Sequence, residues 1–289
     1  MHIKILIILA CVPLYVINSF CDKIISAKKG DRCNTLYNCI KFFLCSLCML
    51  PLLFAAPPAK VGMGSVICGL ICGLLYTVSK TVMLKGYETS SVAFMTLCHS
   101  SGMILPCIVG HFLWNEKLNF FGLFGIVITV LSILLLKGSG GKKDKIQTVG
   151  ILCGLVIFLT SGGVMLTQKT MGHSFQGEGV TLYTLYSFLL PTLLLGILSG
   201  SKVKSIDWKK DGKLLWLCAS GSALSLAAIS LVMTFLAADV PSVILFPLFN
   251  GTGIIALCIF SVFAFGEKLN LKKAIGLILG VLGLCLINL

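Results

Sequence analysis

Two polar side chains, His99 and Asn250, lie at the centres of long apolar stretches of the sequence. A polar group deep in an apolar helix is costly, and such groups are functional candidates by default. Two roles fit the pair: hydrogen bonding to a small molecule from two walls of a cavity, or a helix–helix hydrogen bond worth about 1 kcal/mol. Thr252 adds a hydroxyl close to Asn250. His99 is also a candidate for proton transfer, because an imidazole titrates near neutral pH.

A second group of polar residues repeats one spacing in two other apolar stretches. Tyr15 and Asn18 lie three residues apart, and Tyr76 and Ser79 share that spacing. Residues three apart lie on one face of a helix, so each pair is a candidate for lining a cavity. Lys80 follows directly and is expected to be the one basic residue well inside an apolar stretch. Its ammonium could bind a carboxylate or another anionic group, or its stem could carry the charge out to water; both roles fit the sequence.

No motif of enzyme chemistry accompanies these residues. The sequence has no His-Glu-x-x-His, no Gly-x-Ser-x-Gly and no phosphate-binding loop. The acidic residues that border the apolar stretches lie at their ends, not at their centres: Asp22, Glu88, Glu116, Glu178, Asp239 and Glu267. Cys45-x-x-Cys48 has no second pair of ligands nearby, so we interpret the cysteines as small helix-packing residues. We therefore expect no enzyme activity, no cofactor and no metal site.

The composition is that of a polytopic α-helical membrane protein. Of the 289 residues, 57% are hydrophobic and 11% are charged, and the mean hydropathy is +1.03. A soluble domain carries about 25% charged residues. The net charge of +13 does not indicate a nucleic-acid partner, because the lysines gather in short loops, where basic residues set membrane topology.

Apolar stretches bounded by charge, Gly or Pro predict ten transmembrane helices. About 20 apolar residues cross the hydrocarbon core of a bilayer. The predicted spans are 4–20, 36–56, 62–84, 89–113, 119–137, 146–168, 179–199, 212–236, 240–265 and 271–289. The first span could pass for a signal peptide, but it lacks a small-x-small cleavage site. We therefore expect it to be a permanent helix.

The sequence also predicts an internal repeat. Residues 88–136 align without a gap on residues 239–287, and roughly a third of the positions are identical. The tetrapeptide Glu-Lys-Leu-Asn occurs in both segments, at 116–119 and at 267–270. Each copy precedes the last span of its half, where its Asn is suited to cap the helix.

Each half of the chain therefore holds five spans, at 1–137 and 146–289, joined by a linker at 138–145. Because five is odd, the two halves must enter the membrane in opposite orientations, an arrangement typical of secondary transporters. His99 and Asn250 are repeat mates at the predicted midplane, between the halves. The lysine-rich odd-numbered loops predict that both termini lie outside the cytoplasm.

Three features of the sequence are similar to one known family. The first is the two-by-five repeat. The second is the pair of phrases "FLWNEKLNFFGLFG" at 112–125 and "FAFGEKLNLKKAIG" at 263–276, which follow the family's pattern of Gly-Glu, a polar turn and a Gly-bearing final helix. The third is "YVINSFCDK" at 15–23, where Asn and Lys match the family's Trp-Gly-x-Asn…Lys pattern while Tyr and Val replace its Trp and Gly. The family is the ten-helix, EamA-like branch of the drug/metabolite transporter superfamily.

This resemblance implies an all-α protein of ten transmembrane helices, arranged as two inverted EamA-like repeats. It implies a secondary transporter that moves a small metabolite, an amino acid or similar organic solute, by alternating access in efflux or exchange. Its partners would be that solute and membrane lipid, in a monomer or homodimer of the cell (plasma or inner) membrane. Family members often have cytoplasmic termini, opposite to the charge pattern. A flippase for a lipid-linked small head group and a non-transport membrane protein are the alternatives.

Overall fold

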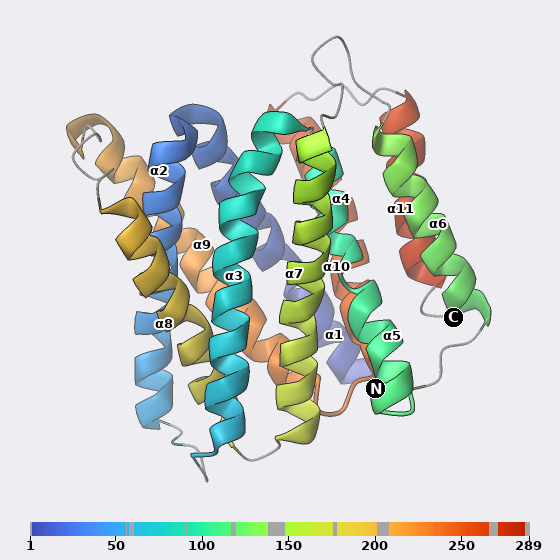
Figure 1. Ribbon diagram of the computed structural model, residues 1–289, viewed down its shortest axis with the longest axis horizontal. Coiled ribbons are helices and arrows are strands. Elements are labelled where there is room, and N and C mark those ends of the chain that lie inside the picture. Colours follow the sequence, from blue (N-terminus) through green and yellow to red (C-terminus); the bar gives the residue numbers. More distant parts are fainter. Residues whose placement is uncertain are drawn as a thin grey trace. The chain divides into compact units, whose positions relative to one another are not determined.

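A computed structural model of the chain describes residues 2–55, 57, 61–90, 92–116, 120–137, 148–175, 178–200, 208–265 and 271–286. All regular secondary structure in these ranges is α-helical (Figure 1). The predicted all-α class is therefore confirmed. The predicted linker at 138–145 and the second Glu-Lys-Leu-Asn at 267–270 lie outside the described residues.

The helices follow the predicted spans closely in the second half of the chain and less closely in the first. Their bounds are α1 His2–Ala10, α2 Val12–Ala55, α3 Met63–Thr89, α4 Val92–Ser101, α5 Ile104–Leu113, α6 Phe120–Lys137, α7 Thr148–Ser174, α8 Val180–Ser199, α9 Trp208–Leu236, α10 Ser242–Phe265 and α11 Leu271–Leu286. Ten spans fit these helices if α1 joins the start of α2, α2 contributes a second span, and α4 and α5 form one. The inverted relation of the two halves stays a prediction.

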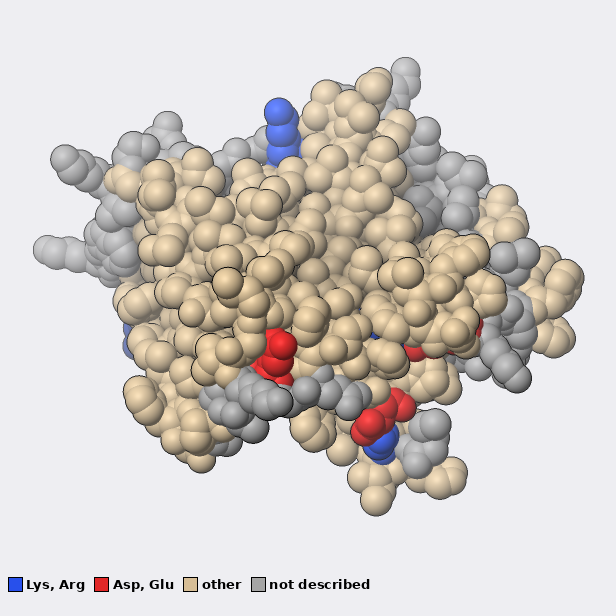
Figure 2. Space-filling model, turned by 60° about the horizontal axis from the view of Figure 1, so that its bottom comes forward, with Lys and Arg blue, Asp and Glu red and all other residues tan. Residues whose placement is uncertain are grey.

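Several helices are long and apolar enough to cross a membrane. Six candidate spans satisfy both criteria within the described residues: His2–Asp22, Asn34–Ala55, Met63–Met83, Thr148–Ser174, Val180–Ser199 and Gly212–Leu236. Shorter apolar helices occupy Leu97–Leu113, Ser242–Gly253 and Ala274–Gly283. Figure 2 shows a face on which uncharged residues cover most of the surface. Large exposed apolar side chains such as Phe54 and Phe112 belong in contact with lipid rather than water.

The chain forms two compact units. Unit 1 contains Met1–Val12, Lys85–Leu166 and Val240–Leu289, and unit 2 contains Pro13–Leu84 and Thr167–Asp239. Each unit thus draws its helices from both predicted halves of the sequence. Unit 2 is built mainly from α2, α3, α8 and α9, while α4, α5, α6, α10 and α11 belong to unit 1.

Helix α2 differs from the sequence prediction, because helical backbone continues through the loop expected between 4–20 and 36–56. The Tyr37 hydroxyl nevertheless lies 2.8 Å from Asp22 Oδ1. In a straight helix, residues fifteen apart would be separated by roughly 22 Å. The chain must therefore reverse between Asp22 and Tyr37. We call Val12–Asp22 the first arm of α2 and Asn34–Ala55 its second arm.

Small residues set the packing of α3 against α8 in unit 2. A Cβ atom on Gly69 would lie 2.8 Å from the Tyr183 carbonyl oxygen, and one on Gly73 would lie 2.9 Å from Leu190 Cβ. Any side chain at these positions would push the two helices apart. Gly69-x-x-x-Gly73 is therefore a small-residue packing face, as is common between membrane helices.

The predicted span at 89–113 is broken in unit 1, and this is a correction to the sequence prediction. Helix α4 ends at Ser101 and α5 begins at Ile104. Across the break, the amide groups of Gly102 and Met103 donate to carbonyls three residues back, as in a 3₁₀ turn. A Cβ atom on Gly102 would approach the Gly162 nitrogen of α7 to 2.6 Å. The close approach of α7 therefore requires glycine at the break.

Two glutamates at span ends accept hydrogen bonds from backbone amides at the N-termini of other helices. Glu116, in the first Glu-Lys-Leu-Asn, accepts a hydrogen bond from the Ser242 amide at the start of α10, at 2.9 Å. Glu178 accepts one from the Ser65 amide in the first turn of α3, at 3.0 Å. Each carboxylate satisfies an amide that has no partner within its helix, and it lies at the positive end of the helix dipole. Asn119, the cap predicted for α6, lies outside the described residues.

Candidate functional site

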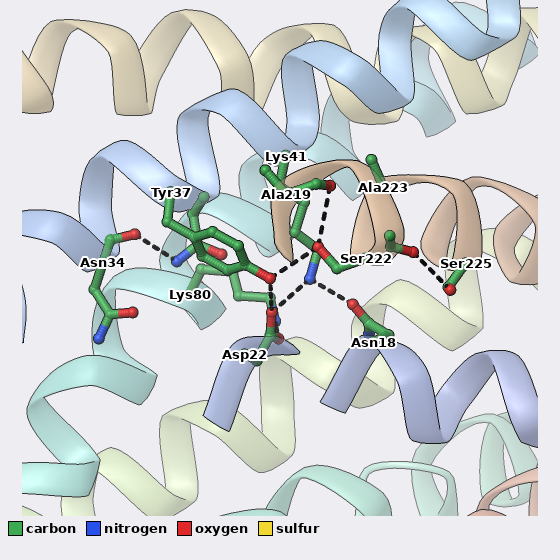
Figure 3. Close-up of polar contacts among 12 residues, drawn as sticks. Asn18, Asp22, Asn34, Tyr37, Lys41, Lys80, Ala219, Ser222, Ala223 and Ser225 are labelled. Carbon is green, nitrogen blue, oxygen red and sulfur yellow. Dashed lines mark hydrogen bonds and ion pairs between the residues drawn. The ribbon is translucent and has the colours of Figure 1, made fainter. Parts of the chain in front are cut away.

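Unit 2 contains a group of charged and polar side chains that contact each other inside the helical packing (Figure 3). We call it the Asp22 cluster. It consists of Asn18, Asp22, Tyr37, Lys41, Lys80 and Ser222. The members come from the first arm of α2, its second arm, α3 and α9, so four helical segments must pack together to form it.

The Asp22 carboxylate is at the centre of the cluster, and its two oxygens are used differently. Oδ1 lies 2.9 Å from the Lys41 ammonium and 2.8 Å from the Tyr37 hydroxyl. Oδ2 lies 3.0 Å from the Lys80 ammonium. One acid thus pairs with two lysines, one on each oxygen.

Neighbouring groups hold the Oδ1 side in place. Lys41 also donates to Asn18 Oδ1 at 2.6 Å, and its ammonium lies 5.8 Å from the centre of the Tyr37 ring. The Tyr37 oxygen is 2.8 Å from Ser222 Oγ. An ionised carboxylate can only accept hydrogen bonds, so Tyr37 donates to Asp22 and Ser222 donates to Tyr37. Every polar group on this side therefore has a partner.

The cluster is buried to an extent that is unusual for charged groups. The Lys41 side chain is 0% exposed, and those of Lys80 and Asp22 are 20% and 25% exposed. Lys80 lies three residues before Met83, where its candidate span ends, and Asp22 is the last residue of its own candidate span. The contacts between them place the cluster within roughly 10 Å of that end of the spans. It lies within the candidate spans, close to one end of them and near the reversal of α2.

Aromatic rings lie next to the cluster. Tyr76 is one helical turn before Lys80 on α3, and Phe42 follows Lys41 on the second arm of α2. The Tyr76 ring centre is 5.6 Å from that of Phe42 and 6.1 Å from that of Phe188 in α8. These distances are typical of packed aromatic pairs. We call these three residues the aromatic layer.

The structure brings some of the predicted site residues together in unit 2. Asn18 and Lys80 belong to the Asp22 cluster, and Tyr76 belongs to the aromatic layer. Ser79 is buried beside them on α3, and Tyr15 is partly buried one turn before Asn18. Their roles in binding stay predictions.

The other three predicted site residues lie in unit 1, where the Asn250 and Thr252 side chains contact backbone of their own helix. Asn250 donates to the Phe246 carbonyl of its own helix at 2.9 Å, and Thr252 donates to the Leu248 carbonyl. His99 is in the last turn of α4, directly before the break, and its carbonyl accepts a hydrogen bond from Ser161 at 2.7 Å. The hydroxyls of Ser100 and Ser101 are buried there and have no hydrogen-bond partner among the described residues. A binding role for His99, Asn250 and Thr252 stays a prediction.

Sequence reasoning missed Asp22, Tyr37, Lys41 and Ser222. The expectation that Lys80 is the one basic residue well inside an apolar stretch was wrong, because Lys41 is fully buried in the second arm of α2. A lysine six residues into the predicted span 36–56 was the available signal. Asp22 gave no such signal, because its sequence position is a span end and only the reversal of α2 brings it to Lys41.

Comparison with known proteins agrees with the resemblance found in the sequence. Residues 2–137 match the model of the EamA-like transporter family. The predicted resemblance is therefore confirmed over the first half of the chain, and it indicates a membrane transporter of the drug/metabolite type. A transporter family also agrees with the expectation that the chain is not an enzyme.

Two individual proteins add to this. A Bacillus subtilis (strain 168) protein named uncharacterized transporter YxxF is 27% identical over 81 residues, which are 28% of this chain and 26% of that protein. The match thus spans about a quarter of the curated relative. A crystal structure of a protein with no stated function superposes on 99% of this chain and 96% of its own, with a TM-score of 0.72 and 12% identity. At that identity the likeness shows the fold alone.

Proposed function

We propose that this chain, EamA-like over residues 2–137, is a secondary transporter for a small metabolite, an amino acid or a similar organic solute. It moves the solute by alternating access, in efflux or exchange. The inverted repeat predicted from the sequence supports this mechanism, because two halves of similar shape can exchange conformations and expose one site to each side in turn. His99 and Asn250 are proposed to face the solute as repeat mates, with Tyr15, Ser79 and Thr252 as further lining residues.

The observation that carries the proposal is the buried Asp22 cluster. Ionisable side chains inside membrane spans are costly and mark substrate or ion pathways by default. A purely structural role explains the cluster poorly, because replacing a buried ion pair by apolar residues of similar volume is often neutral or stabilising. Side chains of Asp22, Lys41 and Lys80 instead pair across three helical segments, at a place where two of them keep partial exposure.

Flux through proteoliposomes tests the proposal. The purified chain is reconstituted, and net efflux is measured for a panel of labelled amino acids, organic acids and amines against protein-free liposomes. We expect at least one solute to move in the wild type. Asp22→Asn has nearly the same shape but leaves two buried lysines without a counter-charge, so its net flux should fall about tenfold or more.

Lys85→Met is the matched control, because Lys85 is exposed on the same helix as Lys80 and its loss removes the same charge. It should transport as the wild type does. The same liposomes carry a fluorescent lipid that reports scrambling between leaflets. Lipid scrambling without flux of any solute would favour a flippase over a solute transporter. The absence of both activities would favour a non-transport membrane protein.

A further inference from the structure

We propose that Lys80 binds an anionic group of the transported solute, and that the Lys80 ammonium pairs with the Asp22 carboxylate when no solute is bound. The solute is then an organic monoanion, with a carboxylate at one end and an apolar body. This inference rests on the proposed transport function and names the substrate class of that same site. Four observations on unit 2 support it.

The first observation is that the two oxygens of Asp22 have different surroundings. Among the described residues, Oδ1 has two partners, Lys41 and Tyr37, whereas Oδ2 has one, Lys80. If Lys80 turns away, the carboxylate still keeps an ammonium at 2.9 Å and a hydroxyl at 2.8 Å. The charge of Asp22 therefore stays compensated, and the cluster can release Lys80 without leaving an unpaired buried carboxylate, which would be strongly destabilising.

The second observation is that the two lysines differ in access. The Lys41 side chain is fully buried and hydrogen-bonds to both Asn18 and Asp22, while the Lys80 side chain is 20% exposed. An ammonium has three donor hydrogens, and within the part of the chain that the structure describes Lys80 uses one of them, on Asp22. Lys80 is thus the lysine that can reach an incoming anion, and Lys41 is the lysine that remains with Asp22.

The third observation is the charge of the cluster. One carboxylate and two ammonium groups leave an excess of one positive charge among its described residues. A bound monoanion neutralises that excess, whereas a cation would raise it inside the membrane region. Because charge is costly there, the cluster selects an anion over a cation of the same size.

The fourth observation is the aromatic layer beside Lys80. Side chains four residues apart on a helix are neighbours, so Tyr76 lies over the same face of α3 as Lys80. Phe42 and Phe188 are fully buried and pack against the Tyr76 ring, which is partly exposed. A solute whose carboxylate meets Lys80 can place an apolar body against the Tyr76 ring. This explains a preference for an organic acid over a small inorganic anion.

A charge series of solutes tests the inference on the wild-type protein. Phenylalanine, phenylpyruvate and phenethylamine share a ring and differ in charge, as do leucine, 4-methyl-2-oxopentanoate and isoamylamine. Exchange is measured in proteoliposomes with each compound on both sides. We expect the 2-oxo acids to exchange fastest and the amines slowest. Exchange of the amines in preference to the 2-oxo acids would overturn the inference while leaving a transporter, and no flux of any solute would overturn the transport function itself.

Variants of Lys80 separate recognition from packing. Lys80→Met keeps most of the stem but loses the ammonium, so exchange of the 2-oxo acid should fall about 10- to 100-fold, the worth of a hydrogen bond to a charged group. Lys80→Arg keeps the charge and should restore at least part of the exchange, while Lys85→Met should match the wild type. Undiminished exchange in Lys80→Met would overturn the inference.

Asp22→Asn gives a change that loss of folding cannot imitate. Removing the internal carboxylate frees Lys80, so the half-saturating concentration of the 2-oxo acid in exchange should fall about tenfold, as expected when a competing bound state is removed. Exchange with solute on both sides avoids the return of the empty carrier, in which Lys41 and Lys80 of this variant would have no counter-charge from Asp22. A half-saturating concentration equal to or above that of the wild type would contradict a role for Asp22 as the internal partner of Lys80.

Discussion

Polar side chains find their hydrogen-bond and ion-pair partners in different ways in two regions of the chain. In the Asp22 cluster of unit 2, side chains from different helical segments bind each other, as Lys41 and Lys80 bind Asp22. In unit 1, one side chain next to the break between α4 and α5 and one in α10 bind backbone instead. Asn250 donates to a carbonyl of its own helix, and Ser161 donates to the His99 carbonyl.

This difference shows which polar residues depend on tertiary contacts for their hydrogen-bond or ion-pair partners. A hydroxyl or amide can satisfy itself on the carbonyl four residues earlier, whatever the rest of the fold does. A buried lysine or aspartate needs a countercharge from elsewhere in the structure. Charged residues therefore report on tertiary contacts in a way that Asn250 and Thr252 do not. Substitutions in the two regions should differ accordingly.

The largest effect is expected for Lys41→Met. This change removes the two hydrogen bonds of the Lys41 ammonium, to Asp22 and to Asn18, which at about 1.5–3 kcal/mol each amount to about 3–6 kcal/mol. The free energy of unfolding in detergent micelles, measured by denaturant titration, should fall by that amount. Lys85→Met loses the same charge at an exposed position and should stay within about 0.5 kcal/mol of the wild type. Equal stabilities of the two variants would show that the pair is not needed for folding.

A smaller effect is expected for Tyr37→Phe. The variant keeps the ring but removes the hydroxyl that donates to Asp22. A hydrogen bond to a charged group is worth about 1.5–3 kcal/mol, and the same titration measures the loss. Tyr183→Phe is a matched control, since the buried Tyr183 hydroxyl lies 3.1 Å from uncharged Thr167. It should cost about 0.5–1.5 kcal/mol, the value for neutral partners. A larger cost for Tyr183→Phe than for Tyr37→Phe would contradict a special strength of hydrogen bonds to the Asp22 carboxylate.

Gly102→Ala tests the broken helix of unit 1. Its new methyl would collide with Ser161 and approach the Gly162 nitrogen to 2.6 Å, so overpacking should cost about 1–3 kcal/mol. Gly196→Ala introduces the same methyl in α8, where the nearest atom is Cys39 Sγ at 3.6 Å. That control should be neutral or stabilise by about 0.5–1 kcal/mol, because alanine is the better helix former. Thermal unfolding of both variants checks the contrast, and equal melting temperatures would argue against a tight break.

The smallest effect on stability is expected for Asn250→Ala. It removes a hydrogen bond within one helix, and side-chain hydrogen bonds in membrane proteins average about 0.6 kcal/mol. If Asn250 and its repeat mate face the solute as proposed, flux should be lost in both Asn250→Ala and His99→Ala while expression stays intact. Proteoliposome flux at equal protein content measures this. Normal flux in both variants would remove the two residues from the site.

Much of the fold could be predicted from the sequence, because hydropathy reports directly on membrane spans. The bounds predicted for α6, α8, α10 and α11 differ from the structure by only a few residues. The break at Gly102 was not predicted, because the polar residues directly before it, His99, Ser100 and Ser101, were considered as candidates for binding and not as the end of a helix. The continuous α2 was not predicted either, because the charged residues between its arms look like an ordinary loop.

The candidate site was predictable only in part. Lys80 and Asn18 stood out as polar residues inside apolar stretches, and both belong to the Asp22 cluster. Asp22 and Lys41 were missed because each is notable only as the ion-pair partner of the other. Their contact joins the two arms of α2 and is not visible in the sequence. A search for isolated polar residues cannot find a pair whose members look ordinary when taken singly.

The reversal of α2 has a consequence for the way the chain enters the membrane. Each buried charge would oppose insertion of its span, by about 2.5–3.5 kcal/mol at the bilayer centre and less near its surface. Because the arms are joined by a short reversal, Asp22 and Lys41 can meet as a helical hairpin and enter together as a neutral pair. Both arms are synthesised before α3. Lys80 would then reach a carboxylate that already has a partner, as the proposed release of Lys80 requires.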